Sequence, residues 1–214
     1  TAYELTGQEK IPERICDAEV VITNKLKLNR QTLAGADKLK LICVTATGYD
    51  NIDVAYCTER GIAVCNVPGY STDSVAQLTI AAALALATNL IAYRGHVHSG
   101  FYSRCGSPNI LTPVWHELAG NTWGIVGCGN IGRKVAAVAE AIGCNVLVYR
   151  RKPDPYYETA DLDTLLRRSD VVSIHLPLTE QTRGILSRDK IALMKKNAIL
   201  VNVARGAVTD EAAL

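Results

Sequence analysis

The chain has 214 residues, of which 48% are hydrophobic and 21% are charged. This length suits one large domain or two small ones, and the composition is typical of a globular protein. The formal net charge is +2 and there is a single phenylalanine, so no basic stripe with interleaved aromatic residues is present. We therefore expect neither nucleic acid nor a membrane among its partners.

Seven cysteines are scattered along the chain without a CxxC pair: Cys16, Cys43, Cys57, Cys65, Cys105, Cys128 and Cys144. An odd number without the spacing of a disulfide framework indicates reduced, mostly buried thiols. We therefore predict a cytoplasmic protein that holds no metal through these cysteines.

The N-terminal part of the chain alternates between apolar runs and a helical pattern. Apolar runs at 19–23, 40–44 and 62–67 predict three short strands. Residues 52–60 predict a helix, and Gly61 is placed to cap its C-terminus. Such alternation predicts a parallel sheet that helices cover on both faces.

The longest apolar stretch begins at residue 75 and predicts one buried helix over 75–93. Polar residues such as Gln77 and Thr79 interrupt it, so a membrane span is not favoured. Alanine and leucine occupy more than one of its faces, which predicts packing against a second subunit and a homodimer. Residues 94–113 are rich in glycine and proline and predict a linker or hinge.

The most informative stretch, 122–151, contains an apolar run, a GxGxxG turn, a helical pattern and a second apolar run at 146–149. This context indicates a dinucleotide site. Gly127 permits a tight turn, Gly129 lets a pyrophosphate approach the backbone, and Gly132 allows close packing of the helix. The helix N-terminus offers free N–H groups to phosphates. The alternative is a glycine turn in an ordinary βα unit that binds nothing.

The residues after this second strand bear on which cofactor is bound. An NAD site usually places a carboxylate there for the ribose hydroxyls, but this chain has Arg150, Arg151 and Lys152. A guanidinium binds a 2′-phosphate through paired hydrogen bonds, so the residues favour NADP over NAD. An NAD ribose held by backbone groups, with these cations on the surface, remains the alternative.

The alternation resumes toward the C-terminus, with helices predicted at 161–168 and 187–194 and strands at 171–176 and 198–203. Ser187 is the expected N-cap of the second helix. The chain then stops where a further helix begins. We therefore expect a piece of a longer protein, built as two doubly wound parallel-sheet α/β domains that are both incomplete.

Four segments (46–54, 66–77, 117–133 and 175–214) resemble the D-isomer-specific 2-hydroxyacid dehydrogenases. The glycine motif with VNVARG is the most specific part, and the likeness is strongest to the glycerate dehydrogenase/hydroxypyruvate reductase group. The resemblance implies a substrate domain over 1–93 that includes the connecting helix 75–93. A linker over 94–113 and an NAD(P)-binding Rossmann domain over 114–214 follow.

The resemblance also implies hydride transfer between NAD(P)H and a small 2-keto or 2-hydroxy acid. Arg205 matches the family's catalytic arginine, and Ala46, Thr47 and Gly48 match its carboxylate-binding loop. The implied cofactor-binding residues are Val75, Gly127, Gly129, Asn130, Ile131, Gly132, Arg150, Arg151, His175, Leu176, Pro177, Thr182, Val203 and Ala204.

The family's proton-donating histidine and its glutamate partner would follow the last residue, Leu214. His175 lies at a strand end, but it matches a cofactor-lining segment and not the acid. We therefore expect the chain alone to bind cofactor weakly and not to turn over. A nucleotide-sensing, co-repressor-like protein that binds without turnover is the alternative function.

Overall fold

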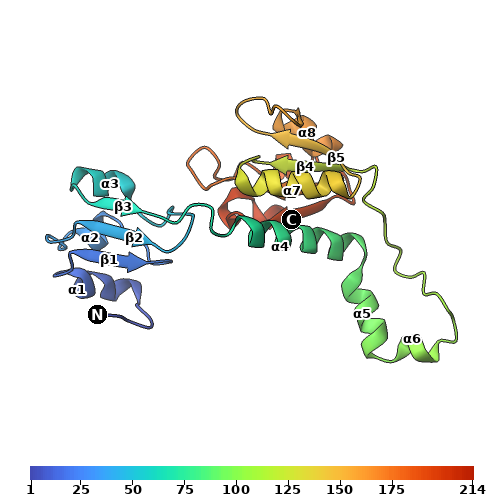
Figure 1. Cartoon of the computed structure of the whole chain (residues 1–214), viewed down its shortest axis with the longest axis horizontal. Helices are drawn as coiled ribbons and strands as arrows, with labels where there is room; N and C mark the ends of the chain where they lie inside the picture. Colours follow the sequence, from blue (N-terminus) through green and yellow to red (C-terminus); the bar gives the residue numbers. More distant parts are fainter. The chain divides into compact units, whose positions relative to one another are not determined.

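The computed structural model describes residues 1–214, which form two compact units, Thr1–Ser71 and Thr72–Leu214 (Figure 1). Each unit contains one parallel sheet, with three strands in the first and five in the second. The predicted α/β class with two parallel sheets is therefore confirmed.

The sheet of the first unit has the strand order β1-β2-β3. Its strands are β1 (Val20–Thr23), β2 (Leu41–Val44) and β3 (Ala63–Cys65). The third strand is shorter than the predicted 62–67. One apolar cluster lies in this unit, and it includes Leu33, Ile42 and Val44.

Short helices join these strands. They are the 3-10 helix η1 (Gln8–Lys10), α1 (Ile11–Ile15), α2 (Arg30–Leu33) and α3 (Val54–Glu59). The side chain of Asp53 accepts a hydrogen bond from the N–H of Tyr56 and caps the start of α3. Gly61 has a φ of +67°, so it ends this helix in the left-handed conformation, as we predicted.

The sheet of the second unit has the order β6-β5-β4-β7-β8. Its strands are β4 (Thr122–Val126), β5 (Asn145–Tyr149), β6 (Glu158–Thr159), β7 (Val171–Ile174) and β8 (Ile199–Asn202). The order reverses at β4, where β5 lies on one side and β7 on the other. Open parallel sheets bind ligands at such a switch point, outside the carboxyl ends of the strands.

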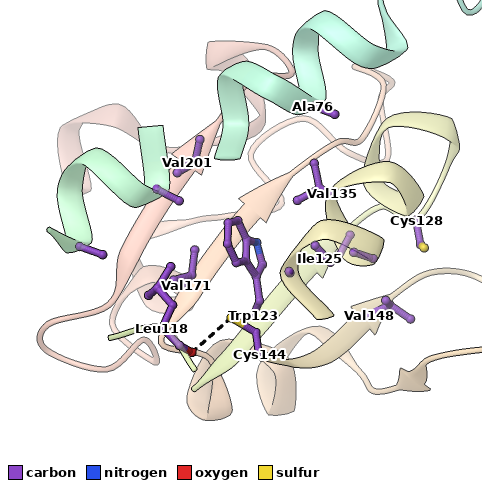
Figure 2. Close-up of a cluster of buried hydrophobic side chains, with 14 residues drawn as sticks. Ala76, Leu118, Trp123, Ile125, Cys128, Val135, Cys144, Val148, Val171 and Val201 are labelled. Atoms are coloured by element: carbon purple, nitrogen blue, oxygen red, sulfur yellow. Dashed lines mark hydrogen bonds between the residues drawn. The ribbon is translucent and has the colours of Figure 1, made fainter. Parts of the chain in front are cut away.

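Apolar clusters cover both faces of this sheet. Alternate residues of β4 point to opposite faces, so Trp123 and Ile125 enter one cluster and Val126 enters the other. The first cluster joins the sheet to α4 (Thr72–Ala87) and α7 (Asn130–Ala141), and Figure 2 shows Trp123 at its centre.

The opposite cluster includes residues of α8 (Leu162–Arg168) and α9 (Arg188–Ile191). The second unit is therefore doubly wound. As predicted, Ser187 caps α9, since its hydroxyl accepts from the N–H of Lys190. The chain ends in two 3-10 helices, η2 (Gly206–Val208) and η3 (Glu211–Ala213).

The single helix predicted over 75–93 is wrong. The chain forms α4 and then α5 (Leu90–His98), with a bend of 69° between them. Asn89 takes a left-handed φ of 52°, and its side chain donates to the carbonyl of Val114. This long-range bond holds a residue in a conformation that interrupts the helix. Apart from this bent pair, no helix is long and apolar enough to cross a membrane.

The region predicted as an irregular linker, 94–113, is partly helical. It contains the end of α5 and the short α6 (Phe101–Arg104). The compact units divide before Thr72, whereas we predicted the helix from residue 75 as part of the first domain. In the structure α4 contacts α7 and β8, because its alanines Ala76 and Ala83 enter the cluster around Trp123 (Figures 1 and 2).

Candidate functional site

The glycine turn joins β4 to α7 at the switch point of the second sheet. Gly127 has a φ of +97°, a conformation that side chains rarely adopt, and its N–H donates to the carbonyl of Tyr149. Gly129 is the N-cap of α7, so the N–H groups of the first helical turn face the open end of the turn. Asn130 and Ile131 form the start of that helical turn.

The three glycines differ in the space around them. A Cβ on Gly132 would lie 2.2 Å from the carbonyl oxygen of Gly127, so helix and turn touch there. A Cβ on Gly129 would meet nothing within 4 Å, so the space beside this exposed glycine is open at the N-terminus of a twelve-residue helix. Close packing at one glycine and open space at another fit a bound pyrophosphate.

A buried ion network lies at the end of β5, beside the glycine turn. Arg150 and Arg133 both donate to one oxygen of Asp154, over 2.5 Å and 2.9 Å. The Asp154 side chain is fully buried, whereas the two arginine side chains remain 31% and 40% exposed. Arg151 and Lys152 are exposed. Arg150, predicted as a cofactor residue, is therefore already paired with a carboxylate.

The charge state of this network follows from its hydrogen bonds. Burial acts to raise the pKa of Asp154, but bonds from the N–H of Tyr156 and from both arginines outweigh it and lower the pKa to about 2. Asp154 is therefore ionised at neutral pH. Its charge adds to burial in raising the pKa of the Cys128 thiol within the glycine turn, which keeps that thiol protonated and unreactive.

His175 is held by a hydrogen-bond chain that starts in the core. The Trp123 indole donates to the Ser173 hydroxyl over 3.0 Å, and that hydroxyl lies 2.9 Å from Nε2 of His175. Ser173 is fully buried, so its own proton needs an acceptor. If Ser173 donates to Nε2, only the Nδ1–H of His175 is left without a partner. The reverse tautomer would leave two unpaired groups, so the Nδ1–H form is favoured.

This environment does not suit a proton donor. Burial lowers the pKa of His175 from 6.5 to about 4, so the ring is neutral at physiological pH. His175 therefore belongs to the wall of the turn, since its backbone would contact any Cβ added to Gly127, as would the Leu176 side chain. After exposed Pro177, the loop is fixed by Thr182, whose hydroxyl donates to the Pro177 carbonyl and accepts from the Thr179 N–H.

Arg205 lies in the turn that follows β8, at the carboxyl end of the same sheet. The Asn202 side chain shapes this turn, because it donates to the Arg205 carbonyl over 3.0 Å and accepts from the Ala204 N–H over 3.0 Å. Arg205 itself donates to the Ala204 carbonyl. An open hollow of about 470 Å³ adjoins this turn, and Val203, Ala204 and Arg205 line it together with Glu211.

The predicted carboxylate-binding loop of the first unit follows β2. The Asn66 amide donates to the Thr47 carbonyl over 2.8 Å, and the Thr47 hydroxyl donates to the Val67 carbonyl over 3.1 Å. The N–H groups of Thr47 and Gly48 donate to no protein acceptor. The loop is thus fixed through its carbonyl and hydroxyl groups while two N–H donors stay available for an anion.

The structure brings most of the predicted cofactor residues of the second unit to the carboxyl ends of its strands. Val75 lies half-buried in the first turn of α4, and its carbonyl accepts from Thr79. Sequence reasoning missed Arg133, Asp154, Ser173 and Asn202. A polar residue at the end of an apolar strand, just before Arg205, was the available signal for Asn202. No local pattern marks Asp154, whose arginine partners are Arg133 on α7 and Arg150 directly after β5.

The comparisons with known proteins agree with this arrangement. A family model described as the NAD binding domain of D-isomer specific 2-hydroxyacid dehydrogenases matches residues 80–214. A D-3-phosphoglycerate dehydrogenase of Methanocaldococcus jannaschii is 41% identical over 97% of this chain and 40% of its own length. A glycerate dehydrogenase of Methylorubrum extorquens is 36% identical over 99% of this chain and 67% of its own length. The chain thus spans about 40 to 67% of the length of these two relatives.

Solved structures show the same likeness. D-lactate dehydrogenase from Aquifex aeolicus, complexed with NAD and lactic acid, has a TM-score of 0.85 at 33% identity, over 94% of this chain and 61% of that one. An acyclic imino acid reductase in complex with NADPH and D-Arg has a TM-score of 0.90 at 27% identity, over 99% of this chain and 68% of that one. The matched model and these relatives show that the chain belongs to the D-isomer specific 2-hydroxyacid dehydrogenase family.

Proposed function

We propose that the chain serves an oxidoreductase that transfers a hydride between NAD(P)H and a small 2-keto or 2-hydroxy acid of the hydroxypyruvate, glyoxylate or glycerate type. The observation that carries the proposal is the glycine cradle at the switch point, with its open space at Gly129 and the N-terminus of α7 behind it. The similar glycerate dehydrogenase supports the substrate class.

The residues of the second unit divide the work between them. The N–H groups at the start of α7 bind the pyrophosphate, and the wall from His175 to Pro177 lines the cofactor with Val203 and Ala204. The nicotinamide supplies or accepts the hydride. Arg205 offers a fork of donors that binds a carboxylate and polarises a keto oxygen. Asn202 holds the turn that presents it.

The first unit contributes a carboxylate-binding loop in this proposal. The unpaired N–H groups of Thr47 and Gly48, with the loop that starts at Ala46, are the donors. Backbone donors fixed in a rigid loop bind an anion without the entropy cost of ordering a long side chain.

We favour NADP over NAD as the cofactor. Arg150 lies at the end of β5 with part of its guanidinium exposed, followed by exposed Arg151 and Lys152. A similar structure holds NADPH and another holds NAD, so relatives of both kinds exist. Initial rates with glyoxylate, hydroxypyruvate and a larger 2-keto acid, measured with NADH and NADPH in parallel, test this choice in the full-length protein. Equal or better rates with NADH contradict it.

We also propose a homodimer that forms through residues 75–93, as the sequence predicts. Leu78, Leu86, Leu90 and Ile91 are each more than half exposed on α4 and α5. Exposed apolar side chains grouped on neighbouring helices mark association surfaces. Light scattering of the full-length protein should give twice the mass of one chain, and the mass of a monomer contradicts the proposal.

Calorimetry of the chain with NADPH and with NADH tests the proposed function directly. We expect one molecule bound per chain, with NADPH bound more tightly. Absence of binding by both cofactors contradicts the proposal. Binding by both the chain and the full-length protein, without turnover of any of the three acids, would instead support a nucleotide sensor.

A further inference from the structure

Asp154 connects three parts of the second unit that meet beside the glycine turn. One oxygen of its carboxylate accepts from Arg150 at the end of β5 and from Arg133 on α7. The other oxygen accepts from the N–H of Tyr156 over 3.0 Å. The Asp154 N–H donates to the Thr159 hydroxyl over 2.8 Å, so the loop after β5 is fixed at both sides of the carboxylate.

Asp154 differs from the carboxylate that binds the ribose hydroxyls in a typical NAD site. Its side chain is fully buried and three hydrogen bonds occupy its oxygens, so it has no surface with which to contact a ribose. It acts on the cofactor edge through the two arginines that donate to it. A carboxylate and a phosphate bind a guanidinium in the same way, so Asp154 occupies donors that a 2′-phosphate would also use.

The formal charges of Arg133, Arg150 and Asp154 sum to +1. Without the carboxylate they would sum to +2, and without Arg133 they would sum to zero. Because the carboxylate is fully buried, water screens its effect on the arginines less than it screens an exposed ion pair. The preference for a 2′-phosphate over a hydroxyl should follow this charge.

We propose that Asp154 sets cofactor selectivity by sharing the charge of Arg150, so that the site accepts NADP without rejecting NAD. Asp154 acts through Arg150 and touches no cofactor atom itself. The inference rests on the proposed function, because it assumes that the glycine turn binds a dinucleotide with its ribose at the end of β5.

The test uses two fragments that differ only in the 2′-phosphate, namely 2′,5′-ADP and 5′-AMP. Isothermal titration calorimetry gives the dissociation constant of each for the full chain. The ratio of the 5′-AMP constant to the 2′,5′-ADP constant is the phosphate preference. General damage to the nucleotide site weakens both fragments, whereas the proposed role changes the ratio.

Three variants test the proposal: one should raise the phosphate preference and two should lower it. Asp154→Asn keeps the shape but removes the charge, so the preference should rise about fivefold, the order expected for one unit charge near a partly exposed anion site. Arg133→Gln should lower it by about the same factor, for the same reason. Arg150→Gln should bring the preference close to one. Arg133 is 40% exposed on α7, and Arg150 and the N–H of Tyr156 still donate to Asp154 when Arg133 is replaced.

Glu158→Gln is the matched control. Like Asp154→Asn, it removes a carboxylate charge that is paired with an arginine, in this case Arg168 of α8. Both of these side chains are about half exposed, and neither contacts the Asp154 network. It should leave the phosphate preference unchanged.

Each outcome decides between the claims. A wild-type chain that binds neither fragment contradicts the proposed function. A wild-type chain that binds both, with a preference that stays constant or falls in Asp154→Asn, overturns the role of Asp154 and leaves the proposed function standing. If Asp154→Asn does not fold, the sign of the change in Arg133→Gln decides, and an unchanged or increased preference overturns the proposal.

Discussion

Two loops of this molecule follow parallel strands and present backbone N–H groups, but they are built differently. The loop after β2 carries side chains at Ala46 and Thr47 and is held by amide and hydroxyl bonds to Asn66 and Val67. The turn after β4 depends instead on glycines, because Gly132 packs against the backbone of Gly127 and leaves no room for a side chain. A small carboxylate needs a few fixed donors, whereas a long pyrophosphate needs the backbone itself to come close.

The contrast predicts different sensitivities in the two loops. The turn after β4 tolerates no added atom where helix and backbone touch. The loop after β2 tolerates side chains but depends on the bonds that fix its carbonyls. An added side chain in the turn after β4 should therefore weaken cofactor binding by crowding. Loss of a hydrogen bond in the loop after β2 should weaken substrate binding because the loop becomes less well fixed.

Gly132→Ala should have the largest effect. The new Cβ would lie 2.2 Å from the Gly127 carbonyl, so the turn or α7 must shift. We expect nucleotide affinity to fall beyond detection by calorimetry and stability to fall by about 1–3 kcal/mol, as for overpacked sites. Urea unfolding gives the stability. A variant with wild-type stability and NADPH affinity would show that the close contact in the turn is not essential.

Arg205→Gln should follow in size. Removal of one positioned donor to a developing oxyanion costs about 100- to 1,000-fold in rate, so kcat/KM of the full-length protein should fall by that order. NADPH affinity should stay the same. Arg183→Gln, an exposed arginine in the loop after β7, is the control and should leave kcat/KM unchanged. A tenfold or smaller loss in Arg205→Gln speaks against its catalytic role.

Asn66→Ala tests the other loop. It removes the donor to the Thr47 carbonyl, so the loop loosens and the KM for the keto acid should rise about tenfold, the cost of one hydrogen bond. NADPH affinity should not change. Gln8→Ala removes an amide bond to the Lys27 carbonyl, outside this loop but in the same unit, and controls for lost stability. The same KM in both variants would mean that the loop after β2 does not bind substrate.

His175 should give the smallest effect, a pH dependence of stability. The pKa of its folded form is about 4 and that of the unfolded form is near 6.5, so the unfolded chain binds more protons between these values. Its contribution to stability is therefore complete above pH 6.5 and is lost as the pH falls toward 4. Nitrogen-15 NMR should show a neutral Nδ1–H ring at pH 6. A ring that is half protonated there contradicts the burial.

Local patterns predicted much of this fold. The glycine spacing, the strand at 146–149 and the caps at Gly61 and Ser187 involve neighbours within a few residues, and the structure confirms their local geometry. The two-residue strand β6 was missed because its register with β5 depends on the tertiary fold.

The features that the sequence did not predict share a physical cause: each depends on residues far away along the chain. The break at Asn89 depends on the carbonyl of Val114, so helical propensity alone predicts a continuous helix. The pairing of Arg150 depends on a carboxylate in an irregular loop and on Arg133 from α7. A run of basic residues looks free in the sequence, and only the fold shows which of them has a buried counter-ion.

Gly129→Ala tests the central claim, that the turn after β4 binds the cofactor, most directly. Its Cβ would contact nothing within 4 Å and its φ of −84° suits alanine, so thermal unfolding should match the wild type. The methyl group would stand where the pyrophosphate must approach, so calorimetry should show NADPH binding at least tenfold weaker, about the cost of one lost charge-assisted hydrogen bond. A folded Gly129→Ala variant that binds NADPH as tightly as the wild type would contradict the account.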